Sequence, residues 1–165
     1  MSASPFAGNR PVGISSMAVY VPPYRVDLER WCGWTGNDPA KTRAVVGHAF
    51  RMCGPDQNVY TLAANAVLRL IAQYDIHPGR IGYLALGTES SIDNAAGAVI
   101  VRGLVDAALA VEGRPTLARD CEVPEFKHAC LGGVYALKGG LRYLACDGRD
   151  RQAIAVSADI AEYAR

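Results

Sequence analysis

The fold class follows from the stretch Ile81–Leu86, which has the sequence IGYLAL. This stretch is short, uninterrupted and apolar, as is typical of a strand buried on both faces of a sheet. The polar turn Thr88–Asn94 comes shortly after it and leads into a small-residue helix predicted from about Ala95 to Leu109. Since a parallel connection needs a crossover of helical length, a buried strand followed by a helix favours a parallel sheet.

Further elements are predicted on the carboxyl-terminal and amino-terminal sides of this stretch. A helix is predicted over Val59–Gln73, with cap candidates at Asp56 to Asn58. A weaker strand (116–122), a helix (130–145) and a last strand (152–158) follow the helix that begins near Ala95. The residues expected near the buried face of the helix Val59–Gln73 are Leu62, Ala66, Val67, Leu70 and Ile71.

The first third of the chain is less regular. Residues 1–11 have no periodicity and predict a flexible tail, and the folded part of the chain is expected over 12–165. Residues 12–21 are mostly small and β-branched, which predicts a buried strand that ends at Pro22. Residues 27–58 are punctuated by glycines and prolines, and we expect an irregular, helix-containing excursion there.

The alternation of strands and helices predicts an α/β layered fold with a mostly parallel sheet. The carboxyl ends of parallel strands meet at one edge of the sheet, and ligands of open α/β sheets bind at such an edge. We therefore expect that edge to hold Glu89, the segment that leads to Cys130, and Asp159.

Composition excludes several classes of protein. Of the 165 residues, 50% are apolar and 20% are charged, which is globular composition. The 17 basic and 16 acidic residues give a formal charge of +1, so neither nucleic acid nor an anionic membrane is an expected partner. The phosphate-binding patterns GxGxxG and GxxxxGK do not occur, so no nucleotide site is predicted.

The cysteines and the apolar runs predict a cytoplasmic protein. The five cysteines form no CxxC pair, so we expect neither a zinc site nor a disulfide framework. No signal peptide is recognisable in the first twenty residues. The longest apolar stretch, Ala95–Val111, is interrupted by Arg102 and Asp106, so no membrane span is predicted.

Cys130 is the first candidate for chemistry. It lies at the start of the predicted helix 130–145, where unpaired backbone N–H groups and the positive end of the helix dipole stabilise a thiolate. Lys127 and His128, just upstream, would add to this effect, and His128 is the only histidine expected near the site. The alternative is a small, buried, unreactive cysteine.

Two carboxylates follow the buried strand. Glu89 faces the predicted site, where partial burial would suit it to general acid/base work. The alternative for Glu89 is an exposed carboxylate that caps a helix. Asp93 has the competing role of capping the helix that begins near Ala95.

The helix 130–145 is rich in glycine. Each interior glycine costs roughly 1 kcal/mol relative to alanine, which is easier to accept if another backbone must approach closely. We expect this helix to be packed centrally against another helix, and the alternative is that the glycines break it. These glycines are Gly132, Gly133, Gly139 and Gly140.

Several motifs together resemble one enzyme family. They are GTESSID at 87–93, KHAC at 127–130 and DIAEYA at 159–164, with support from YVPPYRVD at 20–27 and LAANA at 62–66. Their residues and order are similar to the amino-terminal half of 3-hydroxy-3-methylglutaryl-CoA synthase, a thiolase-superfamily enzyme. The match runs from about Val12 to the last residue.

The resemblance implies a thiolase-like fold, present here as the amino-terminal half only, and a condensing reaction. It implies that Cys130 is acylated by an acyl-CoA substrate and that its N–H helps to hold the oxyanion. Glu89 would remove a proton from the acetyl methyl group, and the resulting carbon nucleophile would attack a β-ketoacyl thioester. Asp93 and Asp159 match supporting carboxylates. No permanently bound cofactor and no metal are implied.

Two departures from the family pattern affect the prediction. Leu131 stands where the family often has an aromatic residue, which leaves the acyl preference open. No histidine of this chain matches the catalytic histidine of the family's second half. We therefore expect a partner, a carboxyl-terminal-half subunit that carries this histidine, in a hetero-oligomer.

Two other functions stay open at this point. One is a thiolase-fold ketosynthase or acyltransferase that acts on acyl carrier protein substrates, although Glu89 is unusual for a ketosynthase. The other is a non-catalytic structural subunit that supports an active paralogue.

Overall fold

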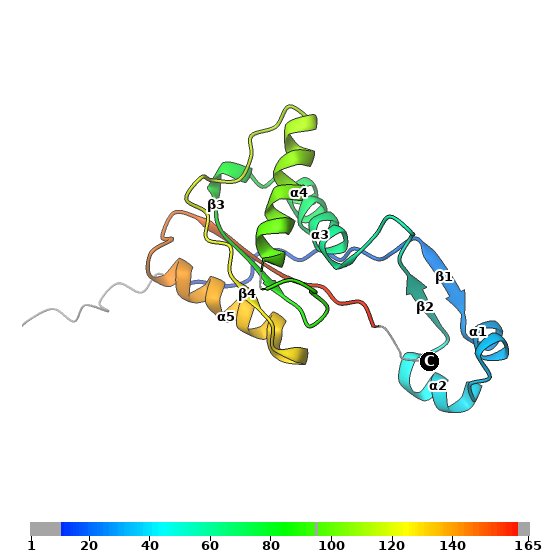
Figure 1. Cartoon of the computed structure of the whole chain (residues 1–165). Helices are drawn as coiled ribbons and strands as arrows, with labels where there is room; N and C mark the ends of the chain where they lie inside the picture. The colour runs from blue at the N-terminus through cyan, green and yellow to red at the C-terminus, as the bar shows by residue number, and fades with distance from the viewer. Residues whose placement is uncertain (1–10, 95, 162–165) are drawn as a thin grey trace, which may run out of the picture. The chain divides into compact units, whose positions relative to one another are not determined.

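The computed structural model describes residues 11–94 and 96–161, which form two compact units (Figure 1). The smaller unit is Val21–Asn58, and the larger unit holds the other described residues. The predicted tail, 1–11, lies outside the described residues except for Pro11. The elements of the larger unit are α3 (Val59–Gln73), β3 (Ile81–Gly87), α4 (Gly97–Val111), β4 (Glu125–Phe126), α5 (Gly132–Ala145) and β5 (Gln152–Ser157), with short 3-10 turns at Pro78–Arg80 and Ala129–Leu131.

The larger unit is built on a parallel sheet with the strand order β4-β3-β5. β3 lies in the middle, and all of its residues are buried. The predicted buried strand and the mostly parallel sheet of an α/β fold are confirmed. α3 and α4 cover one face of the sheet and α5 covers the other (Figure 1).

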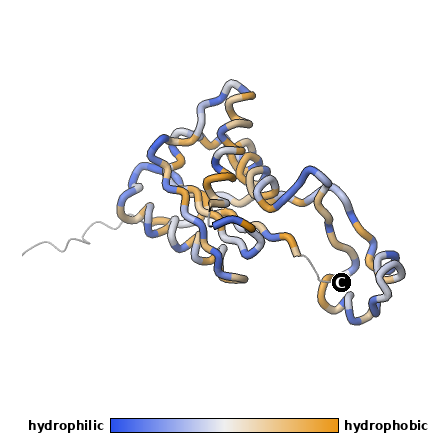
Figure 2. Tube along the Cα trace, viewed as in Figure 1, coloured by the Kyte–Doolittle hydropathy of each residue, from blue (hydrophilic) through white to orange (hydrophobic). Residues whose placement is uncertain are grey.

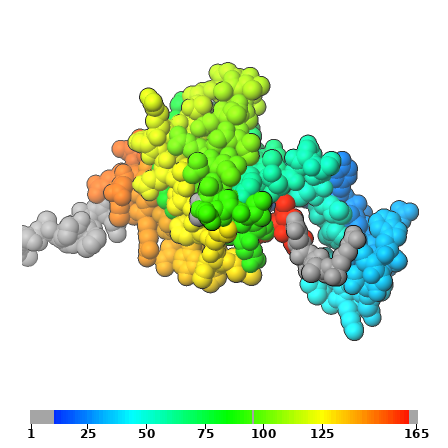
Figure 3. Space-filling view, in the orientation of Figure 1, coloured from blue at the N-terminus to red at the C-terminus, as the bar shows by residue number. Residues whose placement is uncertain are grey.

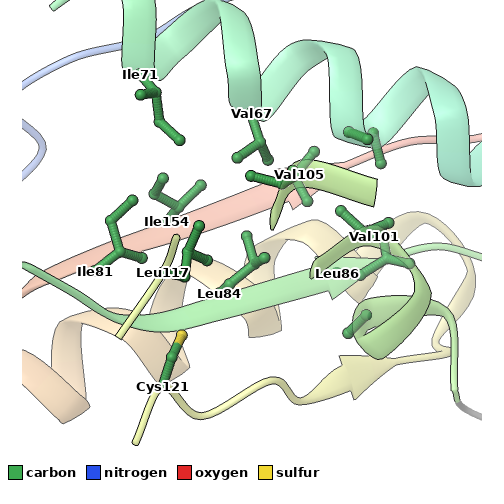
Figure 4. Close-up of a cluster of buried hydrophobic side chains, with 14 of the residues drawn as sticks. Val67, Ile71, Ile81, Leu84, Leu86, Val101, Val105, Leu117, Cys121 and Ile154 are labelled. Atoms are coloured by element: carbon green, nitrogen blue, oxygen red, sulfur yellow. The ribbon is translucent and has the colours of Figure 1, made fainter. Parts of the chain in front are cut away.

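The face under α3 and α4 holds the main hydrophobic core. Leu84 and Leu86 of β3 and Ile154 of β5 point toward the apolar side chains of both helices (Figure 4). In Figure 2, apolar residues are concentrated where α3 and α4 meet the sheet. The core residues that the two helices contribute include Ala63, Ala64, Val67, Ile71, Ala98, Val101, Val105 and Leu109.

The helix Val59–Gln73 is confirmed, and Val67 and Ile71 of its predicted buried face are buried, but the rest of that face differs. Leu62, Ala66 and Leu70 are only partly buried, whereas Ala63 and Ala64 are buried. α3 packs against both α4 and β5. The small side chains of Ala63 and Ala64 allow both elements to come close to the helix. The predicted start of the next helix, Ala95, lies outside the described residues, and α4 begins at Gly97.

The glycines of α5 pack against the sheet. A Cβ on Gly139 or Gly140 would meet the ring of Tyr83, at 2.2 Å from its Oη and 3.6 Å from its Cδ1, respectively. Among the described residues α5 contacts β3, β4 and β5, so the expectation of a neighbouring helix is wrong for this chain. The glycines do not break α5 either, since the helix is continuous from Gly132 to Ala145.

The smaller unit is an antiparallel β-ribbon with two helices between its strands. The elements are β1 (Tyr24–Asp27), α1 (Leu28–Thr35), α2 (Pro39–Val46) and β2 (Ala49–Met52). Side chains of Asp27 and Asp38 cap the two helices, accepting from the N–H groups of Arg30 and Ala40, respectively. The predicted helix-containing excursion is confirmed, and its two strands were not predicted.

The predicted strand over residues 12–21 is wrong. No described strand pairs with this segment, and a strand is stable only when its backbone groups are paired with a neighbour. Its side chains are accordingly exposed, including Ile14 (63%), Met17 (69%) and Val19 (63%).

The weaker strand predicted over residues 116–122 is also displaced. Polar side chains of α4 bind the backbone here: Asp106 accepts from the N–H of Leu117 at 2.8 Å, and Arg102 donates to the carbonyl of Ala118 at 2.9 Å. These bonds take the place of strand neighbours, and pairing with β3 begins only with a single bridge at Glu122 and continues as β4.

None of the helices among the described residues is long and apolar enough to cross a membrane.

Candidate functional site

A backbone contact between two glycines fixes the centre of the predicted site. A Cβ on Gly87, the last residue of β3, would lie 2.3 Å from the carbonyl carbon of Gly132, the first residue of α5. A Cβ on Gly132 would in turn lie 2.6 Å from the carbonyl oxygen of Phe126. The end of β3 and the start of α5 therefore touch along their main chains, which only residues without a side chain allow.

This contact brings the two predicted catalytic segments to one sheet edge. Glu89 follows Gly87 by two residues, and Cys130 precedes Gly132 by two residues. Both side chains are exposed, and the structure gives no hydrogen bond between them among the described residues. The segments share the edge, as predicted, and the two side chains face solvent there.

Cys130 lies in a 3-10 turn, Ala129–Leu131, that precedes α5. The predicted position of the thiol, inside the first turn of the helix, is therefore wrong by two residues. The turn is closed by a hydrogen bond of 2.9 Å from the N–H of Leu131 to the carbonyl of His128. Ala129 has φ 39°, a conformation that is uncommon for a residue with a side chain. The local chain path presents the Cys130 thiol to solvent, so the alternative of a buried core cysteine is also wrong.

Asp159 holds the turn that carries Glu89. Its Oδ1 accepts from the N–H of Glu89 at 2.7 Å, from Oγ1 of Thr88 at 3.0 Å and from Oγ of Ser90 at 3.0 Å. The structure thus brings Asp159 and the Glu89 turn together, as predicted. The expected partial burial of Glu89 is wrong, because its side chain is exposed.

Asp93 is bound by Tyr60, a residue that the sequence did not single out. The Tyr60 hydroxyl donates to Oδ2 of Asp93 and accepts from the N–H of Ile92 at 3.3 Å. The hydrogen bond from Tyr60 lowers the pKa of Asp93, while burial, followed by this bond, raises the pKa of Tyr60. Asp93 also accepts from the N–H of Ala96, but Ala96 is itself the N-cap residue of α4 and no side chain caps the helix, so the predicted capping role of Asp93 is wrong.

His128 and Lys127 lie side by side in the chain but reach different neighbours. The His128 ring packs against Tyr135 of α5, with a centroid distance of 5.1 Å. The Lys127 ammonium donates to the carbonyls of Ser91 and Asp93, at 2.8 and 3.0 Å. Lys127 therefore binds the loop after β3. The sequence had predicted a different role, in which Lys127 helps to stabilise the Cys130 thiolate.

Comparison with known proteins assigns the family. The family model for the hydroxymethylglutaryl-coenzyme A synthase N terminal matches residues 9–165. This chain belongs to the hydroxymethylglutaryl-CoA synthase family. A hydroxymethylglutaryl coenzyme A synthase of Fusarium sp is 35% identical over 92% of this chain, which covers 32% of that protein. A hydroxymethylglutaryl-CoA synthase of Enterococcus faecalis is 31% identical over 92% of this chain and 37% of its own length.

The thiolase-like fold is shown by solved structures. A structure of MvaS in complex with 3-hydroxy-3-methylglutaryl coenzyme A has a TM-score of 0.78 and 36% identity, and the match covers 92% of this chain and 35% of that one. A curacin-pathway HMG synthase in complex with an acetyl donor-ACP has a TM-score of 0.70 at 20% identity, covering 90% and 34%, respectively, which supports the fold alone.

This synthase-family chain spans about a third of the length of the curated relatives that it matches. Its described residues contain no group of three histidine, cysteine or acidic side chains that could hold a metal ion. The motifs 87–93 and 127–130 and residues 159–161 follow the strands of the sheet at this edge. Of the two supporting motifs, residues 21–27 lie in the smaller unit and residues 62–66 lie on α3, while 162–164 are outside the described residues.

Proposed function

We propose that this chain supplies the acyl-accepting thiol and the base of an acyl-thioester condensing site. The observation that carries the proposal is the main-chain contact of Gly87 with Gly132, which places the Glu89 turn and the Cys130 turn at one sheet edge. Membership of the hydroxymethylglutaryl-CoA synthase family supports the same chemistry.

In the first step the Cys130 sulfur attacks the carbonyl carbon of an acetyl thioester. A new carbon–sulfur bond forms, the bond to the donor sulfur breaks, and the proton of the Cys130 thiol ends on the departing thiol. Exposure of Cys130 supports this role, because an acyl donor of the size of acetyl-CoA must reach the sulfur. The backbone N–H of Cys130 would help to hold the oxyanion.

In the second step the Glu89 carboxylate removes a proton from the acetyl methyl group. The resulting carbon nucleophile forms a carbon–carbon bond with the keto carbon of a β-ketoacyl thioester, and the C=O π bond of that ketone opens as its oxygen takes up a proton to become a hydroxyl. Water then cleaves the thioester to Cys130, which frees the thiol and releases the product as a carboxylate. Asp159 supports this step by fixing the backbone of the Glu89 turn, and Asp93 and His128 support the adjoining loop and the turn before α5.

A partner completes the site. The chain covers about a third of its curated relatives, and none of its histidines matches the catalytic histidine that the family resemblance implies. We propose that a polypeptide equivalent to the remaining part of the synthase supplies this histidine and binds this chain as a hetero-oligomer. Complexes of solved neighbours with CoA, with hydroxymethylglutaryl-CoA and with an acetyl donor-ACP make acyl-CoA the first donor to test and a carrier-bound acyl group the second.

Intact mass spectrometry tests this proposal. The chain, co-expressed with the remaining part of the synthase, is incubated with acetyl-CoA or with acetyl carrier protein. We expect a mass gain of one acetyl group that is lost in Cys130→Ala and retained in the matched control Cys146→Ala, whose cysteine is also exposed. Retention of the adduct in Cys130→Ala contradicts the nucleophile assignment. Full condensing activity of this chain as an isolated monomer contradicts the need for a partner.

A further inference from the structure

β4 and the residue that directly follows it extend two side chains of opposite charge to the loop that carries Glu89. Glu125 and Phe126 form β4, and Lys127 directly follows the strand. Phe126 stacks on Tyr135 of α5, with ring centroids 6.4 Å apart. Glu125 and Lys127 both bind the connection between β3 and α4.

The two side chains hold this connection at several points. Oε1 of Glu125 accepts from Oγ of Ser91 at 2.6 Å, and Oε2 accepts from the N–H of Ala98, in the first turn of α4, at 3.3 Å. Nζ of Lys127 donates to the carbonyls of Ser91 and Asp93 at 2.8 and 3.0 Å. Ser91, which both residues contact, is buried although it lies in a polar loop.

Glu89 depends on this connection for its position. Its side chain is exposed, so the backbone of its loop decides where the carboxylate lies. Asp159 fixes the loop at residues 88–90, and Glu125 and Lys127 fix it at residues 91–98. Lys127 also precedes Cys130 by three residues in the same segment. The segment 125–130 therefore contains the Cys130 thiol and also binds the loop that carries Glu89.

We propose that Lys127 is a positioning residue that sets the place of the Glu89 carboxylate relative to the acyl group on Cys130. The inference rests on the proposed function. An ammonium bonded to two carbonyls contributes charge-assisted hydrogen bonds, which are stronger than neutral ones. Lys127 acts through the loop and touches no reacting atom, so its loss should slow proton removal and leave acyl transfer to Cys130 intact.

The test separates these two steps in the assembled synthase. The Lys127→Met variant is acetylated with acetyl-CoA in heavy water, and mass spectrometry of the Cys130 peptide records both the acetyl adduct and the deuterium that its methyl group gains. We expect the extent of acetylation to match the wild type and deuterium uptake to slow by roughly 10-fold to 100-fold, the range expected for a displaced catalytic group. Lys127→Arg, which keeps the cation, should restore most of the uptake.

Two further measurements keep the outcomes distinct. Lys138→Met, a lysine exposed on α5, is the matched control and should leave both readouts unchanged. Amide hydrogen exchange of residues 88–94 should accelerate in Lys127→Met and not in Lys138→Met. Wild-type deuterium uptake in Lys127→Met, or an equal loss of acetylation and uptake, overturns the positioning role. A wild-type protein that is never acetylated overturns the proposed function instead, and the amide exchange still reports whether Lys127 holds the loop.

Discussion

The two faces of the sheet in the larger unit differ in how they are packed. Beneath α3 and α4, large aliphatic side chains such as Leu84 and Leu86 are fully buried. Beneath α5, the buried cluster is small, consisting of Tyr83, Ala85 and Ala136, and glycines bring main chain against main chain. The first face supplies apolar burial. The second face supplies exact placement of the segment that contains Cys130.

The outer sides of the helices continue this contrast. The outer side of α5 exposes apolar residues, including Val134 (58%) and Leu137 (37%). The helix lies at the surface of the larger unit, as its yellow and orange spheres in Figure 3 show. The α5 face therefore gains less stability from this chain than the α3/α4 face does, and substitutions should separate the two.

The largest effect is expected in the aliphatic core. Leu109→Ala removes a fully buried side chain of α4 and should lower the free energy of unfolding by about 2–5 kcal/mol, through lost burial and the cavity left behind. Leu104→Ala makes the same change on the same helix at a side chain that is 37% exposed, and should cost clearly less. Urea unfolding measures both. Equal losses would contradict the view that burial under this face dominates stability.

The same contrast explains which elements could be predicted from the sequence. β3, α3, α4 and β5 bury aliphatic residues at regular spacing, and the sequence pattern gave them nearly correct bounds. The segment 12–21 has the same composition as a buried strand, yet no described strand pairs with it. Apolar composition predicts a tendency toward a strand, and pairing decides whether the strand forms.

The candidate site was predictable where it depends on chain order. Glu89, Cys130 and Asp159 follow three parallel strands, so their shared edge could be inferred without coordinates. Tyr60 and Glu125 could not, because their roles depend on partners more than thirty residues away along the chain. The position of Lys127 was equally hidden, because β4 begins three residues after the end of the segment that was expected to be the strand.

The second effect concerns the glycine contact of the α5 face. Gly87→Ala places a methyl group 2.3 Å from the main chain of Gly132 and Gly133, where no flexible side chain can move away. Overpacking of this kind should lower the free energy of unfolding by about 1–3 kcal/mol, and it should impair acetylation of Cys130 because the Cys130 turn is displaced.

Gly103→Ala is the matched control for this substitution. Gly103 lies on α4 with no atom within 4 Å of its added Cβ, so alanine should raise the free energy of unfolding by roughly 0.5–1 kcal/mol through helix propensity. Opposite signs for the two glycines in urea unfolding would support the contact at the sheet edge. A neutral Gly87→Ala with normal acetylation would contradict it.

The smallest effect is a pH dependence that belongs to the α3/α4 face. Burial raises the pKa of the Cys121 thiol from 9.0 to about 11. The unfolded chain therefore releases this proton at a lower pH than the folded chain does, so the free energy of unfolding should fall as the pH rises from about 9 to about 11. Tyr83 and Tyr143, whose pKa values burial also raises, act in the same direction.

Cys121→Ala should make the decline shallower in urea unfolding under reducing conditions, and Cys146→Ala, at an exposed cysteine, should retain it. An identical decline in Cys121→Ala would contradict the role of the thiol and assign the pH dependence to Tyr83 and Tyr143, which lie beneath α5.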